Sequence, residues 1–307
     1  MDRQWPEAAL RIAAGDPRNR PIAAEITWPP PKLYARPHGQ TYAISCDENA
    51  VDICPGVDAL SPKEADIDPH ALLISKLKEH SRLHKEDVSE IRAFNITMHE
   101  LGLGEDFVRQ GDRPRASALV VSGVVARYHL LPDGRRQYLS FHLPGDMPDS
   151  QALFVEQMDH AVCAIGPARV ASIPHKELLA AFDRRPSLAF AIWRETLIDA
   201  AIFREAITNN SARPTQRRMA HLFCELYYRS RASGLTDNEV CQTPITLGHL
   251  GETLGMSLAT VNRTLSELRE TGSVDFRHGQ IVVHHWDRLV GLADFDPSYL
   301  HLKRPPL

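Results

Sequence analysis

Small, polar and cationic side chains gather over residues 257–266, where they could hydrogen-bond to the base edges and phosphates of a nucleic acid. Within LATVNRTLSEL the apolar residues recur with the i, i+3, i+7 spacing of one helix face: Leu258, Val261, Leu265 and Leu268. The other face then carries Ser257, Ala259, Thr260, Asn262, Arg263 and Ser266. Arginine can bind guanine O6 and N7 with two hydrogen bonds, asparagine can bind adenine, and hydroxyls suit phosphate. The pattern therefore predicts a helix that could enter a major groove.

A glycine and a serine separate this predicted helix from another apolar rhythm, formed by Leu247, Leu250 and Leu254. Gly255 can adopt the left-handed conformation that ends a helix, and Ser257 can cap the next one, which leaves a three-residue turn. The unit is a helix-turn-helix. Two alternatives are any pair of packed helices and the nucleophile elbow of α/β-hydrolases, to which GMSLA has a faint likeness. Helical periodicity in LGHLGETL, and alanine at the elbow's second glycine position, argue against the elbow.

Length and composition indicate two domains with some additional chain. The 307 residues are 43% hydrophobic, enough for one or two cores, and the net charge is −4. No segment approaches the roughly 20 apolar residues of a membrane helix, and MDRQWPEAAL lacks a signal-peptide pattern. The five cysteines are widely scattered, which suits reduced thiols better than a disulfide framework. We therefore expect a cytoplasmic protein without a membrane partner.

The first part of the chain divides into a proline-rich extension and a run of short strands. Residues 1–70 hold ten of the 22 prolines and show no sustained period, so we expect a disordered or weakly ordered extension. Helical patterns begin near residue 72, and short runs bounded by Gly and Pro follow, such as SALVVSG, VVARYHLL and RRQYLSFHLPGD. Runs of this length, with turn signals such as PDG at 132–134, predict an antiparallel barrel or roll over 72–184.

After Pro186 a long helical run carries apolar residues on more than one face. One domain could hardly cover all of them, so we interpret 186–212 as a dimerisation helix that packs on its own roll and on a second copy. The alternative is a fully buried internal helix. The expected interface residues are Phe190, Trp193, Leu197, Ala200, Ala201, Phe203 and Ile207. Residues 213–296 then form the last domain, followed by a C-terminal tail at 297–307.

This order of parts resembles that of the Crp/Fnr transcriptional regulators over residues 72–296. The resemblance is carried by Gly111-Asp112, Gly123, Pro144-Gly145-Asp146 and the terminal helix-turn-helix. It implies an α+β fold with an N-terminal antiparallel β-roll of the cyclic-nucleotide-binding type, a long dimerisation helix and a C-terminal winged helix-turn-helix. The segment SVDFRHGQIVVHH would supply the wing, with His278-Gly279 between its two short strands.

Departures from the family pattern argue against cyclic AMP as the effector. In members that bind it, a glutamate in the loop after PGD holds the ribose, and an arginine about ten residues later pairs with the cyclic phosphate. Asp149-Ser150 and His160 stand at the matching places here. Losing charge-assisted bonds worth about 1.5 to 3 kcal/mol each should abolish binding. The residues that touch the adenine from the long helix are also replaced, by Phe203 and Arg204, so the pocket could be empty, filled by side chains or adapted to another ligand.

The cysteines and histidines show no metal-binding motif. An iron–sulfur cluster of the Fnr type needs several closely spaced N-terminal cysteines plus one in the roll. Cys46 and Cys54 are separated by seven residues, and only Cys163 falls in the roll, so we do not expect a cluster. Any of the 15 histidines could ligate haem, although no spacing singles one out. His284 and His285 are adjacent on a predicted strand and should point to opposite faces, so the cofactor stays unknown.

The sequence as a whole predicts a homodimeric, sequence-specific DNA-binding transcriptional regulator rather than an enzyme. The resemblance implies a palindromic operator and contact with RNA polymerase, and Arg263 is expected to contact DNA most strongly. Many members have a glutamate four residues before it, where this chain has Ala259, so the family's preferred DNA sequence does not carry over. The alternative is a small-molecule-binding regulatory or enzymatic protein whose helical domain contacts other proteins. GLGED at 102–106 lacks the third glycine of a dinucleotide site, and no catalytic constellation supports the enzyme.

Overall fold

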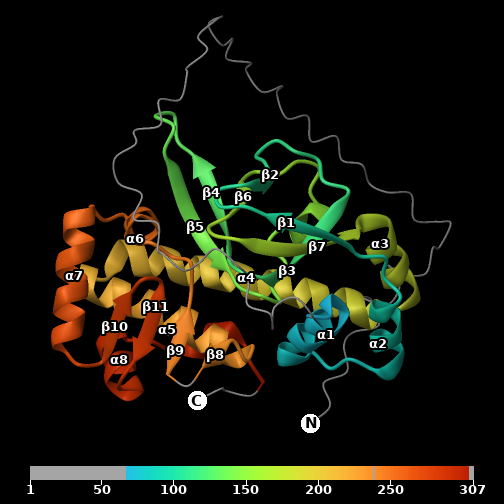
Figure 1. Cartoon of the computed structure of the whole chain (residues 1–307). Coiled ribbons are helices and arrows are strands. Elements are labelled where there is room, and N and C mark those ends of the chain that lie inside the picture. Colours follow the sequence, from blue (N-terminus) through green and yellow to red (C-terminus); the bar gives the residue numbers. More distant parts are fainter. Residues whose placement is uncertain (1–66, 238, 304–307) are drawn as a thin grey trace, which may run out of the picture. The chain divides into compact units, whose positions relative to one another are not determined.

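The computed structural model describes residues 67–237 and 239–303 (Figure 1), so most of the expected N-terminal extension lies outside the described residues. Two short helices come first: α1 (Pro69–His80) and α2 (Lys85–Arg92). Asp68 caps α1 by accepting a hydrogen bond of 2.9 Å from the backbone N–H of His70, and proline occupies the first helical position. No helix in the described ranges is long and apolar enough to cross a membrane.

Seven strands then form the predicted β-roll from two antiparallel sheets. The first sheet has the order β1 (Thr97–Leu101), β7 (Ala168–Pro174), β3 (Ala116–Ser122). The second has the order β2 (Asp106–Val108), β6 (Ala161–Ala164), β4 (Val125–Leu130), β5 (Arg136–His142), and a short 3-10 helix η2 (Ser150–Leu153) lies between β5 and β6. Both sheets contribute to one core of small and branched side chains, which includes Val108, Ala118, Val120, Val125, Val162 and Val170.

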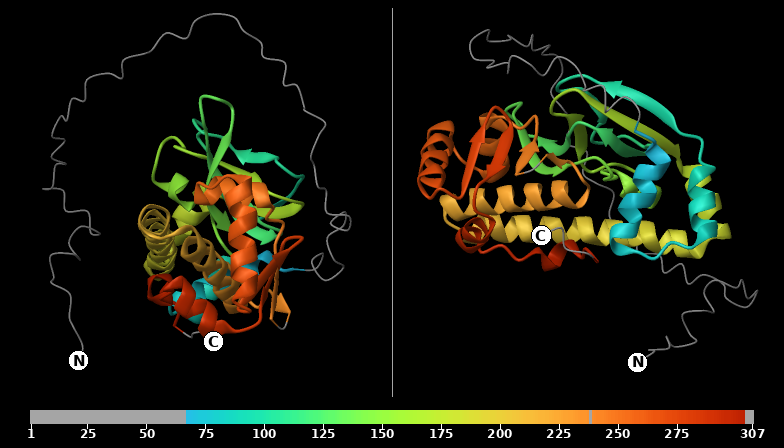
Figure 2. Two further views of the ribbon diagram at one scale, coloured as in Figure 1. Left: turned by 90° about the vertical axis from the view of Figure 1, so that its left-hand side faces the viewer. Right: turned by 60° about the horizontal axis from the view of Figure 1, so that its bottom comes forward.

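The long helix predicted after Pro186 is α4 (Pro186–Ala212), which follows α3 (His175–Arg184). Figure 2 shows α1 and α2 lying beside its N-terminal part. There the helices share a second core with the outer side of the first sheet, built from Leu73, Leu77, Ile91, Leu119, Ile173, Leu178 and Leu188. Arg213 and Pro214, both with extended backbone, separate α4 from the next helix, α5 (Thr215–Ala232).

The remaining elements form the winged helix-turn-helix: β8 (Thr236–Asp237), β9 (Val240–Gln242), α6 (Leu247–Leu254), α7 (Leu258–Glu270), β10 (Val274–Arg277), β11 (Gln280–Val283) and α8 (Trp286–Ala293). The wing is the hairpin of β10 and β11, which turns at His278 and Gly279 with positive φ at both residues. A Cβ at Gly279 would lie 2.0 Å from the carbonyl oxygen of Thr243, so only glycine fits there. The α+β fold class predicted from the sequence is confirmed.

Two details differ from the sequence interpretation. Residues 297–300, assigned to a tail, form the 3-10 helix η3 (Pro297–Leu300), in which Leu300 is buried and the hydroxyl of Tyr299 donates 2.8 Å to Glu225. Their contact with α5 is distant in sequence, so it could not be predicted from the terminal residues alone. His284 and His285 do not lie on a strand: they follow β11, and both backbone N–H groups donate to the carbonyl oxygen of Ser273.

Candidate nucleic-acid interface and sensor pocket

The turn between α6 and α7 has the geometry that the sequence predicts. Gly255 ends α6 in the left-handed conformation, with φ of 64°. Ser257 caps α7 by accepting a hydrogen bond of 3.2 Å from the backbone N–H of Thr260. Because the start of a helix carries a partial positive charge, this end of α7 is suited to approach an anionic backbone.

The outward face of α7 is open. Arg263 exposes 67% of its side chain, and among the described residues it pairs with Glu267, one turn later, at 3.7 Å between Nε and Oε1. Among the other predicted contact residues Thr260 is half-buried, and Ser257, Ala259, Asn262 and Ser266 are exposed. A surface ion pair of this kind contributes little, so the guanidinium of Arg263 can exchange it for a stronger acceptor at small cost.

Leu258 corrects the sequence interpretation of α7. It was assigned to the buried face, but it is 56% exposed. The buried face consists of Val261, Thr264, Leu265 and Leu268. Leu258 is the first residue of the helix and precedes the turn that packs on α5 and α6, so periodicity alone overestimates its burial. An apolar side chain therefore stands beside Ala259 on the outward surface.

The predicted interface residues of α4 divide between two faces. Four large apolar residues are exposed, with Phe190 at 70% and Ile207 at 68%; we refer to Phe190, Trp193, Leu197 and Ile207 as the apolar stripe. Phe154, from the end of η2, extends the stripe: its ring meets that of Trp193 edge to face at 6.1 Å. Sequence reasoning missed Phe154 because it lies in a loop of the roll, well before α4 in the sequence.

The other members of that set pack within the protomer. Ala201 is buried, Ala200 is half-buried, and the ring of Phe203 lies under the guanidinium of Arg127 at 5.2 Å. Phe203 thus contacts the protomer's own roll and Ala201 is covered within the protomer, whereas the apolar stripe is exposed. A helix with one apolar face packed and another exposed is the arrangement expected where a second chain can bind.

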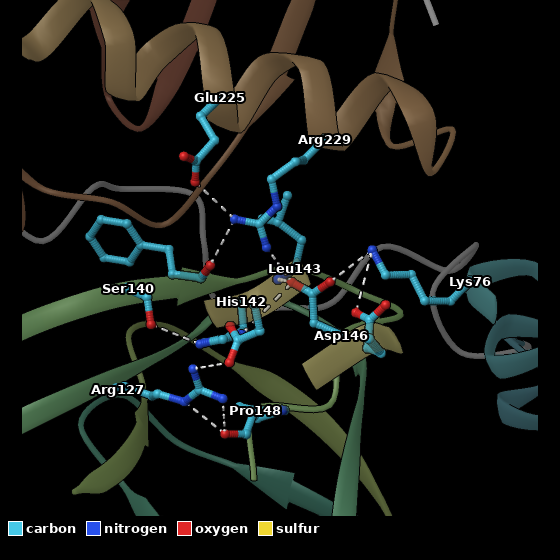
Figure 3. Close-up of polar contacts among 12 residues, drawn as sticks. Lys76, Arg127, Ser140, His142, Leu143, Asp146, Pro148, Glu225 and Arg229 are labelled. Carbon is cyan, nitrogen blue, oxygen red and sulfur yellow. Dashed lines mark hydrogen bonds and ion pairs between the residues drawn. The ribbon is translucent and has the colours of Figure 1, made fainter. Parts of the chain in front are cut away.

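Arg127 occupies the space between the roll and α4 (Figure 3). It lies on β4, is 2% exposed, and donates from Nε to the carbonyl oxygen of Pro148 at 2.7 Å. A second hydrogen bond joins its Nη2 to the same carbonyl, and Nη1 lies 2.6 Å from Oδ2 of Asp199 on α4. Sequence reasoning did not select Arg127. The available signal was a charged residue directly after Val124, Val125 and Ala126 in a strand expected to be buried.

The residues predicted for the sensor pocket surround this arginine in part. Asp149 is buried and accepts 2.8 Å from the backbone N–H of Ala118, and burial raises the pKa of its carboxyl to about 7. Ser150 is buried at the start of η2. His160 bonds to Asp159 and Gln151, and burial, with the charge of Arg127 adding to it, lowers its pKa. Arg204 is exposed on α4 and lies outside this group.

The empty volume beside these side chains differs between the two sides of the roll: an open hollow of about 370 Å³ lies next to Asp149, Asp112 and Arg115, whereas little space remains toward α4. A cavity next to Ser150, Ile202 and Asp199 measures about 30 Å³, which is room for one or two water molecules. Between the roll and α4, the protein's own side chains therefore occupy most of the space. Cys163, the roll cysteine considered and set aside as a cluster ligand, is a buried free thiol whose pKa burial raises to about 11, and Cys46 and Cys54 lie outside the described residues.

Comparisons with known proteins agree with this geometry. A cyclic nucleotide-binding domain matches residues 98–185, and a Crp-like helix-turn-helix domain matches residues 217–292. The fumarate and nitrate reduction regulatory protein of Vibrio cholerae is 25% identical over 220 residues, which cover 72% of this chain and 88% of that protein. The nitrogen fixation regulation protein FixK of Azorhizobium caulinodans is 31% identical over 160 residues, which cover 51% of this chain and 62% of that protein. The structure of FixK2 from Bradyrhizobium japonicum is 27% identical, with a TM-score of 0.59, and the match covers 64% of this chain and 97% of that one.

Proposed function

Since the chain belongs to the Crp/Fnr family of transcriptional regulators, we propose that it binds a palindromic DNA operator as a homodimer and does so without cyclic AMP. The observation that carries the proposal is the exposed, weakly paired Arg263 on the capped helix α7. Action on DNA also implies the cytoplasmic location expected from the sequence. Contact with RNA polymerase belongs to the same proposal, because a regulator must act on transcription once bound.

Direct reading of bases is assigned to the outward face of α7. Arg263 would bind guanine through O6 and N7, and Asn262 would bind adenine or phosphate. Ser257 and Thr260 stand at the helix start, where hydroxyls and backbone N–H groups suit phosphate. Leu258 adds an apolar contact: an exposed leucine at the first helical position fits the methyl group of thymine.

Dimerisation is assigned to the apolar stripe of α4. Phe190, Trp193 and Leu197 recur at intervals of three and four residues, the spacing that lines one side of a helix packed against another. Exposed apolar residues in such a row would be stabilised by burial, at about 25 cal/mol for each Å² removed from water. Two-fold symmetry would then present two copies of α7 to the two halves of a palindrome.

The filled pocket supports independence from cyclic AMP. The Arg127–Asp199 pair lies between the roll and α4, and the cavity beside Asp199 and Ser150, of about 30 Å³, is far below the several hundred Å³ typical of small-molecule sites. His160 is also tied to Asp159 at 2.7 Å, so it has no free, permanent positive charge for a cyclic phosphate.

The proposal is tested by capturing genomic DNA with the purified protein, with and without cyclic AMP. The expected result is one palindromic consensus, enriched equally in both samples. The matched control is a protein in which Ser257, Asn262 and Arg263 are all replaced by alanine, which should keep the fold and lose the consensus. Absence of any enriched sequence with the folded wild-type protein would contradict DNA recognition, and enrichment only with cyclic AMP would contradict the effector assignment.

A further inference from the structure

The carboxylate of Asp146 joins three separate parts of the chain (Figure 3). Asp146 follows β5 in the loop of the roll and is 5% exposed. Its Oδ1 lies 3.1 Å from Nζ of Lys76 on α1, and its Oδ2 lies 2.5 Å from Nη2 of Arg229 on α5. We refer to Lys76, Asp146 and Arg229 as the Asp146 junction. It connects the N-terminal helix, the roll and the DNA-binding domain through one buried side chain.

The loop holds Asp146 in a fixed position. The backbone carbonyl of Asp146 accepts 2.9 Å from the N–H of Val120 on β3, and the N–H of Gly145 donates 2.8 Å to the carbonyl of Val120. The carboxylate itself accepts 2.8 Å from the backbone N–H of Leu143. The loop is therefore bonded to the sheet on both sides of the aspartate. A rigid anchor of this kind transmits the position of the roll to whatever binds it.

Arg229 uses its guanidinium mainly to bind across the domain boundary. In addition to Asp146, it reaches the carbonyl oxygen of Phe141 on β5 at 3.2 Å. Glu225, one turn earlier on α5, holds the same guanidinium at 3.2 Å. The fork geometry of arginine allows these bonds at once, whereas a lysine could not reproduce them. The orientation of α5 relative to β5 is thus set by two directional bonds.

Charge keeps the junction closed once it has formed. Burial alone would raise the pKa of Asp146, but the positive charges of Lys76 and Arg229 outweigh it and hold that pKa well below its usual range. Asp146 therefore stays ionised wherever the protein is folded. Opening the junction would leave a buried charge without its partner, which costs more than breaking an exposed pair.

Three further contacts join the DNA-binding domain to the rest of the chain. On β5, the side chain of Gln137 donates to the carbonyl oxygen of Glu252 on α6, and the rings of Tyr138 and His249 meet edge to face at 5.0 Å. On α1, the backbone carbonyl of Glu79 accepts 2.8 Å from the N–H of Lys303. Because α6 leads into α7 through a short turn, these bonds also fix the recognition helix relative to the roll.

We propose that the Asp146 junction is a positioning device that sets which spacing of DNA half-sites the protein accepts. The inference rests on the proposed function, since it needs two recognition helices and a palindrome. With each DNA-binding domain held against its own roll, the dimer presents the two helices at one separation. A loosened domain would sample several separations. The effective concentration of the second helix would then fall at the native half-site spacing and become similar to its value at neighbouring spacings.

The test measures spacing selectivity with the full-length protein. Binding is compared on duplexes carrying two half-sites at the selected spacing, at spacings longer by one, two or three base pairs, and on a single half-site. Wild type should prefer its own spacing by about tenfold or more. Arg229→Gln and Asp146→Asn should lose most of that preference and keep the affinity for a single half-site.

The control is Arg185→Gln, which removes an arginine that pairs with the buried Asp87 at 2.8 Å within the N-terminal part of the protein. This variant loses a comparable ion pair and should keep the wild-type spacing preference. Folding of each variant is checked by circular dichroism. If Arg229→Gln does not fold, Arg229→Lys retains the charge without the fork and should still weaken the preference.

The results distinguish a failure of the positioning role from a failure of the proposed function. A folded Asp146→Asn or Arg229→Lys protein with an unchanged spacing preference overturns the positioning role while the regulator stands. An equal loss of spacing preference in Arg185→Gln also overturns the positioning role, because a general loss of stability would then be enough to explain the effect. A wild type that binds one half-site and never two overturns the proposed dimeric function itself.

Discussion

Arg127 on β4 and Asp199 on α4 form an ion pair of 2.6 Å across the space between the roll and the long helix. The guanidinium also binds the carbonyl of Pro148 and lies over the ring of Phe203. A ligand in this space would have to displace the buried guanidinium of Arg127 from Asp199 and from the Pro148 carbonyl. The ligand would then have to supply new acceptors for that charge. The ion pair therefore links β4 to α4 within the protomer.

Cyclic AMP should not bind. The physical reason is the lack of volume beside Ser150 and Asp199, together with the permanent pairing of Arg127. Titration calorimetry with cyclic AMP at tens of micromolar should give no binding heat, and the thermal unfolding temperature should not rise with the nucleotide. A dissociation constant in the low micromolar range would show that the pocket opens.

Asp149 should make stability depend on pH. Its folded pKa of about 7 lies above the ordinary value of 3.8, so the folded state binds the proton more tightly than the unfolded state. Its contribution to the free energy of unfolding is then fully present below about pH 4, falls as pH rises to about 7, and stays constant above that. Asparagine does not titrate, so the Asp149→Asn variant does not lose free energy of unfolding at this position as the pH rises. Relative to wild type, the variant should gain up to about 4 kcal/mol between pH 4 and pH 8, at about 1.4 kcal/mol per pKa unit.

Urea unfolding of wild type and Asp149→Asn in the same series of buffers measures this difference. Buried histidines contribute equally to both proteins, so they cancel in the comparison. The predicted observation is a difference that changes with pH through this window. A difference that stays constant from pH 4 to pH 8 would mean that Asp149 titrates normally.

Replacing Leu197 and Ile207 by glutamate should give monomers. Both side chains belong to the exposed apolar stripe, so the charges should not disturb the protomer's own core but should oppose burial against a second copy. Light scattering at micromolar concentration measures the mass. Leu103→Glu is the matched control, since Leu103 is 68% exposed in the turn before β2 and away from α4. A wild type that is monomeric and still binds a palindrome tightly would exclude this interface.

Local features of the fold could be predicted from the sequence. Gly255 and Ser257 act within one turn of their own positions, so the helix-turn-helix is encoded over a few residues. The same holds for the wing at His278 and Gly279, where the backbone needs positive φ. Short strands bounded by Gly and Pro likewise predicted the roll, because turn chemistry is local.

Features that depend on distant partners could not be predicted in this way. Arg127 and Asp199 are 72 residues apart in the chain, and neither has a local pattern that points to the other. Leu258 follows the helical period, but its burial depends on a neighbour that the first turn of α7 lacks. Ala201 and Leu197 are separated by one turn, yet Ala201 is buried and Leu197 is 49% exposed, a difference that depends on tertiary packing.

The most direct test of DNA reading by α7 is a competition assay on randomised duplexes with wild type, Arg263→Ala and Arg269→Ala at two salt concentrations. Arg269 lies in the last turn of the same helix and pairs with Asp275 at 3.0 Å, so it is a matched control that should change little. Arg263→Ala should lose about 1 to 3 kcal/mol on the selected site and flatten the preference at one base position in each half-site. Loss of affinity spread evenly over all sequences, with a salt slope lower by about one unit, would assign Arg263 to phosphate instead. A folded Arg263→Ala protein with unchanged affinity and unchanged preference would contradict the account.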